Sequence, residues 1–382
     1  MGTRPLAASC AGKTSRVFSG AMLASIISLA VTLLWPQTDV RLQDSPPRVR
    51  AEDIAQLQAR AEGGSATAQL KLARAYESGV GITQDDQLAV LWYRKAAEQG
   101  NSEAQDSLGA KYLTGQGVER NKEEGVKWFR KSARQGNASA MYHLGAAYYN
   151  GDGVPINDGL SYAWFLLAKE AGNQGATEAV QRADSELKPG TIISAFEKIA
   201  EMYEQGGSLP ENPAEAARWW SKAAEKGDVD AQIALAIKMI NGQGVPQDLA
   251  RGRHLCNEAA KHNEHRAEYC MGYIYQHGLG VPRNDKKARN WYELAAAKSQ
   301  INAMRTLALM EIAGEGGKTD RVAAFLLYAR LAETKDQDAL RSMAKLKKDI
   351  TPKEWEQLQK PLLQLRIDPS KLDLVLQHID TQ

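Results

Sequence analysis

Two cysteines and three histidines lie close together in the sequence and could carry chemistry. Cys256 and Cys270 could form a disulfide, and with His254, His262 and His265 they could bind zinc. Thiolate sulfurs and histidine nitrogens are common zinc ligands in proteins. The spacing of these five residues matches no compact zinc motif, so the sequence predicts no metal site, and we interpret the histidines as solvent-facing loop residues.

Other chemistry is not indicated by the sequence. The chain has no G-x-S-x-G motif, no H-E-x-x-H motif and no phosphate-binding glycine loop. Its 382 residues carry a net charge of +2 with both signs interspersed, which gives no electrostatic footprint for nucleic acid. The sequence therefore predicts no catalytic residue, no cofactor and no nucleic-acid partner.

A repeated pattern of two short helices must position the cysteines and histidines. One copy, residues 104–136, reads AQDSLGAKYLTGQGVERNKEEGVKWFRKSARQG. Its Ala104, Leu108 and Tyr112 are spaced at i, i+4 and i+8, so they share one face of a first helix. Gly115 then begins a glycine loop that ends this helix, because glycine adopts positive φ easily.

Seven copies of this pattern keep one register, which we number repeats 1 to 7. The first loop glycine is Gly79, Gly115, Gly151, Gly206, Gly242, Gly278 and Gly314, in steps of 36 residues except for one step of 55. Eleven residues earlier stand Ala68, Ala104, Ala140, Ala195, Ala231, Ala267 and Ala303. Three residues earlier stand Tyr76, Tyr112, Tyr148, Tyr203, Met239, Tyr275 and Glu311. Thirteen residues later stand Trp92, Trp128, Trp164, Trp219, Leu255, Trp291 and Leu327.

Each helix pair has apolar faces that it cannot bury alone, so stacking on neighbouring pairs must build a continuous core. The copy at residues 68–100, with its Trp-Tyr-Arg-Lys-Ala-Ala segment, resembles the Sel1-like repeat (SLR), a relative of the tetratricopeptide repeat. The resemblance covers roughly residues 53–350. It implies an all-α protein, a right-handed α-solenoid of seven 36-residue helix-turn-helix repeats, which binds a protein or peptide partner and is not an enzyme.

The N-terminus is expected to direct the chain to a membrane. Residues 1–16 are basic, and Val17 to Trp35 carry no charge over 19 residues, which is just enough to span a bilayer. We interpret residues 17–35 as an inner-membrane anchor, with the repeats in the periplasm of a bacterium because the short acid-free N-terminus stays inside. The alternative is a signal peptide cleaved near Ala30, which would make the protein a secreted effector or adhesin.

The remaining boundaries follow from the repeat register. Residues 36–52 form a linker, 53–176 hold repeats 1–3, 177–191 form a cap-like insertion, 192–338 hold repeats 4–7, and 339–382 form C-terminal capping helices and a tail. We expect helices at about 177–187 and 338–348. Thr351, Pro352 and Glu354 predict a capping box at the start of another helix.

The register also bears on the two cysteines. Cys256 lies in the second helix of repeat 5 and Cys270 in the first helix of repeat 6. These helices should be antiparallel neighbours, with both cysteines at similar heights, so a disulfide is feasible. Some secreted SLR proteins join adjacent helices in this way, one turn nearer the loop. The alternative is two half-buried thiols.

Partner binding is expected on the first helices, because they line the concave wall of superhelical repeats. Wall positions in repeats 2 to 4 are mostly polar: Lys111, Tyr142, Lys198 and Glu201. Those in repeats 5 to 7 are more apolar: Ile233, Ile237, Tyr269, Tyr273, Ile274 and Arg305. We predict a partner surface that includes Tyr142, Ile237, Tyr269, Tyr273 and Arg305. The alternative is that several of these side chains pack between repeats.

The sequence thus predicts a non-enzymatic scaffold or regulator of the cell envelope that binds a partner on the solenoid surface. The alternative functions are those of a secreted SLR effector or adhesin and of an enzyme or metal-binding protein.

Overall fold

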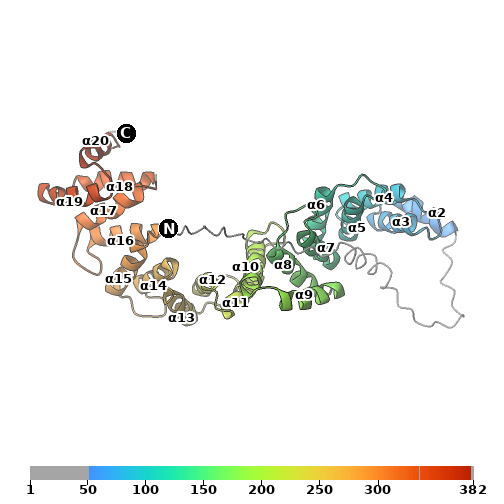
Figure 1. Cartoon of the computed structure of the whole chain (residues 1–382), viewed down its shortest axis with the longest axis horizontal. Helices are drawn as coiled ribbons and strands as arrows, with labels where there is room; N and C mark the ends of the chain where they lie inside the picture. Colours follow the sequence, from blue (N-terminus) through green and yellow to red (C-terminus); the bar gives the residue numbers. More distant parts are fainter. Residues whose placement is uncertain (1–50, 335, 380–382) are drawn as a thin grey trace, which may run out of the picture. The chain divides into compact units, whose positions relative to one another are not determined.

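The computed structural model describes residues 51–334 and 336–379, and this part of the chain is entirely helical, without strands. Its helices are labelled α2 to α20 (Figure 1). The first helices of the seven repeats are α3 (Ala66–Ser78), α5 (Ser102–Thr114), α7 (Ala138–Asn150), α10 (Pro189–Gln205), α12 (Val229–Asn241), α14 (His265–His277) and α16 (Ile301–Ala313). The second helices are α4 (Asp86–Glu98), α6 (Lys122–Ala133), α8 (Asp158–Glu170), α11 (Pro213–Glu225), α13 (Leu249–Ala260), α15 (Asp285–Ala297) and α17 (Arg321–Ala332).

Local capping explains where these helices begin and end. An Asn or Asp side chain caps each second helix, as Asn121 does at α6, where its Oδ1 accepts from the Glu124 backbone N–H. The first loop glycine ends each first helix in the left-handed region, with φ of 81° at Gly115. The second loop glycine is needed for contact between repeats, because a Cβ on Gly117 would lie 2.1 Å from the carbonyl oxygen of Asp86 in the previous repeat.

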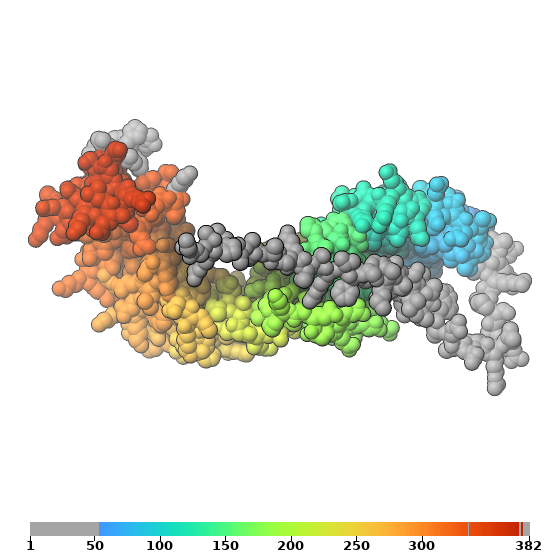
Figure 2. Space-filling model, viewed as in Figure 1, coloured from blue at the N-terminus to red at the C-terminus, as the bar shows by residue number. Residues whose placement is uncertain are grey.

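Each second helix packs against its own first helix and against the first helix that follows, so successive pairs form one continuous stack. Figure 2 shows consecutive repeats packed against one another in the order of their colours. The alanines eleven residues before the loop glycine are all buried, as the repeat pattern predicts. Small residues there let the helix backbones approach closely.

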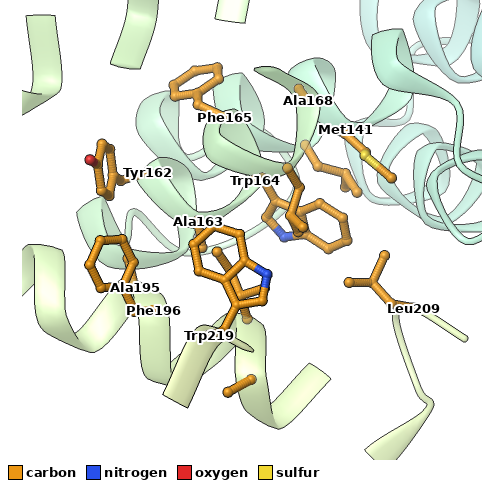
Figure 3. Close-up of a cluster of buried hydrophobic side chains, with 14 of the residues drawn as sticks. Met141, Tyr162, Ala163, Trp164, Phe165, Ala168, Ala195, Phe196, Leu209 and Trp219 are labelled. Atoms are coloured by element: carbon orange, nitrogen blue, oxygen red, sulfur yellow. The ribbon is translucent and has the colours of Figure 1, made fainter. Parts of the chain in front are cut away.

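Four of the five repeat tryptophans lie in the core, as predicted, and the fifth, Trp291, is half-buried. Trp164 and Trp219 belong to one buried cluster with Leu209 (Figure 3). Phe196 packs against Trp219 with ring centres 5.6 Å apart. These large side chains supply much of the buried apolar area that holds repeats 3 and 4 together.

The long step between repeats 3 and 4 contains an additional helix, α9 (Gln174–Glu186). It begins three residues earlier than we expected, because Asn173 caps it in the way that Asn137 caps α7. Both α9 and α10 pack on α8, and α10 begins at Pro189 rather than Ile192, since proline is favoured at the first helical position.

The C-terminal helices are α18 (Gln337–Lys347), α19 (Pro352–Gln364) and α20 (Pro369–Ile379). Their packing is the same as that of the insertion: α18 and α19 both pack on α17, as α9 and α10 both pack on α8. The capping box predicted at Thr351 and Glu354 is present at the start of α19. At the other end, α2 (Ala51–Glu62) precedes repeat 1.

The predicted basic N-terminus, membrane segment 17–35 and most of the linker lie outside the described residues. Among the helices α2 to α20, none is both long enough and apolar enough to cross a membrane.

Candidate functional site

The structure joins Cys256 of α13 to Cys270 of α14 in a disulfide, with the two Cα atoms 6.2 Å apart. Both cysteines are buried, in a cluster that includes Ile233 and Met271. The bond therefore links repeat 5 to repeat 6 inside the core. It leaves no free thiol at either position for metal binding or for nucleophilic chemistry.

The three histidines do not assemble around the disulfide as ligands. His254 and His265 each lie beside a glutamate on their own helix or cap, with His265 Nδ1 3.1 Å from Glu264 Oε1. In the described part of the chain, no group of three His, Cys, Asp or Glu residues could hold a metal ion.

Of the five predicted wall residues, two offer exposed apolar surface and three already contact other parts of the chain. Ile237 and Tyr273 are exposed, at 43% and 40%. Tyr142 and Tyr269 are half-buried, and Tyr142 packs 5.4 Å from the ring of Phe165.

Arg305, the fifth residue, is exposed but forms an ion pair with Asp336, the N-cap of α18. It is thus already engaged within the chain, like the two half-buried tyrosines. Of the five residues, Ile237 and Tyr273 offer exposed apolar surface, and the Tyr273 ring centre lies 4.2 Å from that of His277 on the same helix.

Three of the other predicted wall positions are wrong, because their side chains are buried. Ile233 and Ile274 are buried at 1% and 0%, because their positions on α12 and α14 face the neighbouring helices rather than solvent. Lys111 is also buried, and it compensates two acids of repeat 1. These three residues contribute to packing between repeats, which was the alternative interpretation of the wall.

One exposed residue at an informative position was missed. Leu309 on α16 is 59% exposed and stands five residues before Gly314. Ile237 and Tyr273 stand five residues before Gly242 and Gly278, so the three side chains occupy equivalent positions in repeats 5, 6 and 7. The repeat register itself is the sequence signal that identifies this set.

We call Ile237, Tyr273 and Leu309 the apolar row. Equivalent positions in repeats 1 to 4 carry Arg74, Ala110, Ala146 and Glu201. The row is thus confined to the second half of the array. Large apolar side chains exposed singly are common on proteins, but three at one register position of successive repeats form an organised surface.

The first helices of repeats 1 to 4 present charge instead. Arg74 pairs with Glu103, and His143 lies 2.8 Å from Asp106. At the junction with repeat 5, burial and the nearby acids raise the pKa of Glu197 to about 7.

The acids beside Glu197 are Asp228, Asp230 and Glu201, so the apolar row follows directly on an acidic patch. Two of these acids already have cations, since Arg266 pairs with Asp230 and Lys198 with Glu201.

Comparison with known proteins identifies the repeat. The model of the Sel1 repeat matches residues 66–101, 102–137, 138–173, 197–228, 229–264, 265–299 and 301–333. Among curated proteins, none matches the chain.

Solved structures of SLR proteins are similar to the chain. A protective antigen of uropathogenic Escherichia coli strains with an SLR fold is 29% identical, covering 80% of this chain and 70% of that one, with a TM-score of 0.43. A Sel1 repeat protein from Oxalobacter formigenes is 27% identical, covering 77% and 80%, with a TM-score of 0.39. A putative Sel1 repeat protein from Klebsiella pneumoniae is 18% identical, covering 55% and 92%, with a TM-score of 0.25.

Proposed function

Because the chain belongs to the Sel1 repeat family, whose members generally mediate protein–protein interaction, we propose that it is a non-enzymatic scaffold that binds a partner protein through the apolar row. The observation that carries the proposal is the exposure of Ile237, Tyr273 and Leu309 at one register position of three consecutive repeats. Fully burying a side chain of this size contributes about 1.5–3 kcal/mol, and because these three are 40–59% exposed, a partner that covers them gains about half of that from each.

The chemistry of the partner follows from the surroundings of the row. The row begins beside the acidic patch of Glu197, Glu201, Asp228 and Asp230. Glu201 and Asp230 pair with cations, whereas Glu197 and Asp228 form no ion pair in the described part of the chain. A segment with apolar side chains and a lysine or arginine at one end would complement both parts of this surface.

Photo-crosslinking in living cells tests the proposal. A photoreactive phenylalanine analogue at position 273 should capture one dominant protein, which mass spectrometry identifies. The same analogue at position 74 is the matched control, since Arg74 occupies the equivalent place in repeat 1, outside the row. Capture of the same scattered abundant proteins from both positions would contradict a specific surface on repeats 5 to 7.

We also propose that residues 17–35 anchor the protein in the inner membrane and that the repeats lie in the periplasm. The uncharged run of 19 residues supports an anchor. The Cys256–Cys270 bond supports an oxidising compartment, because disulfides persist there and are rare in the cytosol.

Cell fractionation tests this location. Protein that stays with the inner membrane and is digested by protease added to spheroplasts supports the anchored form. Protein recovered from the medium with a new N-terminus near Ala30 supports the secreted effector or adhesin instead.

A further inference from the structure

Repeat 7, like repeat 5, lacks the two aromatic side chains that the other five repeats carry at their junctions. Glu311 stands where most repeats have tyrosine, and Leu327 stands where five repeats have tryptophan. A pocket of about 440 Å³ lies at this place, lined by both residues. The pocket therefore occupies space that the repeat pattern normally fills with aromatic rings.

The walls of this repeat-7 pocket are mainly aliphatic. Leu307 of α16, Leu327 of α17 and Leu365, the C-cap of α19, line it, and the exposed Gln364 lies at its edge. An apolar cavity of about 150 Å³ already holds a benzene ring, so the available volume is ample for an indole. The exposed edge makes the site accessible to a side chain from outside.

The pocket contains the positively charged side chain of the repeat motif, although the tryptophan ring that this side chain covers in other repeats is missing. In repeats 1, 2 and 4 a lysine stands three residues after the tryptophan and lies over the ring. The distances from Nζ to ring centre are 4.2 Å for Lys95, 3.8 Å for Lys131 and 3.7 Å for Lys222. Arg330 stands three residues after Leu327 and lines the pocket. The positive group of the motif is thus present without the aromatic face that it covers elsewhere.

Two carboxylates, Glu293 and Glu311, line the pocket, and both pair with Arg289, whose Nε lies 3.3 Å from Glu293 Oε1. Glu311 is buried and forms an ion pair with Arg289, whose Nη2 lies 2.5 Å from its Oε2. The Arg330 guanidinium donates to Ser299 Oγ at 3.2 Å, a neutral acceptor that leaves its charge available. The electrostatics of the site therefore favour a ring with a negative face over an aliphatic or an anionic group.

We propose that repeat 7 and α19 form a receptor for an aromatic side chain, tryptophan or tyrosine, of a partner protein. The ring enters between α16, α17 and α19, packs on the leucines and lies against Arg330, as the repeat's own tryptophan does under its lysine elsewhere. This site shares no residue with the apolar row and does not depend on the function proposed for it.

Peptide binding to the full-length protein tests the inference. The probes are acetyl-Gly-Trp-Gly-amide, acetyl-Gly-Leu-Gly-amide and free indole, each followed by ligand-observed NMR. The tryptophan peptide should bind more tightly than the leucine peptide, and Arg330→Gln should weaken its binding about two- to fivefold, the range of an exposed cation–π contact. No binding of the tryptophan peptide, or equal binding of both peptides, would overturn the proposal.

Filling the pocket from within provides the decisive variant. Leu327→Trp restores the side chain of the repeat pattern and should abolish peptide binding. Leu255→Trp makes the same change in repeat 5, away from the pocket, and should leave binding intact. If Leu327→Trp does not fold, Gln364→Trp covers the pocket from its exposed edge and should have the same effect.

Two further outcomes would contradict a receptor for a partner's side chain. One is a folded pocket-filling variant that binds the tryptophan peptide as tightly as the unmodified chain. The other is binding of indole without binding of the peptide, which would make this a site for a free small aromatic molecule. Photo-crosslinking from position 273 is unaffected by either result, so the two proposals fail separately.

Discussion

Lys111, in the first helix of repeat 2, forms an ion pair with Asp86 at the start of the second helix of repeat 1, with Nζ 3.1 Å from Oδ1. The same Nζ lies 2.8 Å from Oε1 of Glu77, and the Lys111 side chain is only 5% exposed. Lys238 repeats part of this contact at the equivalent position of repeat 5, where it pairs with Glu204 of repeat 4. A lysine four residues before the loop glycine, buried in repeat 2 and half-buried in repeat 5, therefore joins neighbouring repeats at two junctions.

Removing this cation should destabilise the array. Lys111→Met leaves two half-exposed acids next to each other without their shared partner, and we expect a loss of about 1–2 kcal/mol in the free energy of unfolding. Lys198→Met is the matched control, because Lys198 is exposed and pairs only with Glu201. Urea unfolding measures both, and an equal loss in the two variants would show that burial of Lys111 has no special effect.

The loop glycine Gly117 should be far more sensitive than a glycine in open surroundings. Gly117→Ala places a Cβ 2.1 Å from the Asp86 carbonyl oxygen, at a φ of 72°, so the two repeats must separate. We expect a loss of about 3 kcal/mol or more.

Gly136→Ala is the control for Gly117→Ala. It has a similar φ of 86° but no atom within 4 Å of the new Cβ, and should cost about 1–2 kcal/mol. Thermal unfolding compares the two, and equal costs would mean that the inter-repeat contact is not tight.

Glu197 should make stability depend on pH near neutrality. Burial and the acids Asp228, Asp230 and Glu201 raise the pKa of Glu197 from 4.5 to about 7, against the nearby cations Lys198 and Arg266. For a carboxyl with a raised pKa, the contribution to stability is fully present below pH 4.5 and is lost as pH rises from there through about 7.

Glu197→Gln should therefore raise Tm by about 1–2 °C at pH 8 and by much less at pH 5, close to the unfolded pKa. Scanning calorimetry at the two pH values measures this. A shift of the same size at both would show that titration of Glu197 is not the cause.

Reduction of the disulfide should lower stability. The bond closes a loop with a sequence separation of 14, for which about 3 kcal/mol is typical. Denatured protein should show one free thiol, Cys10, before reduction and three afterwards. A Cys256→Ala, Cys270→Ala variant should match the reduced protein in Tm. Three free thiols in protein purified without reductant would contradict the bond.

The repeat register was predictable from the sequence because it rests on steric requirements. Alanine is needed where helices approach closely, and glycine where φ is positive, so these residues recur at fixed spacing. The bounds of α9 were less accurate, since the expected start at Thr177 ignored Asn173, whose side chain caps the helix. Helix ends depend on such single hydrogen bonds more than on the apolar pattern.

The candidate surface was only half predictable. Ile237 and Ile233 look equivalent in sequence, yet one is exposed and the other is buried against the neighbouring repeat. Spacing along one helix does not show which side the next helix covers. Leu309 was not predicted because Arg305, one turn earlier on the same helix, has the side chain more typical of an interface anchor.

The most direct test of the central claim is crosslinking from position 273 in a chain whose other row residues are changed. Ile237→Glu with Leu309→Glu should remove the dominant crosslinked product, because a charged side chain then stands on each side of the photoreactive residue at position 273. Arg74→Ala, at the equivalent position of repeat 1, should leave the product unchanged. If the product persists at full yield in a folded Ile237→Glu, Leu309→Glu protein, the apolar row is not the partner-binding surface.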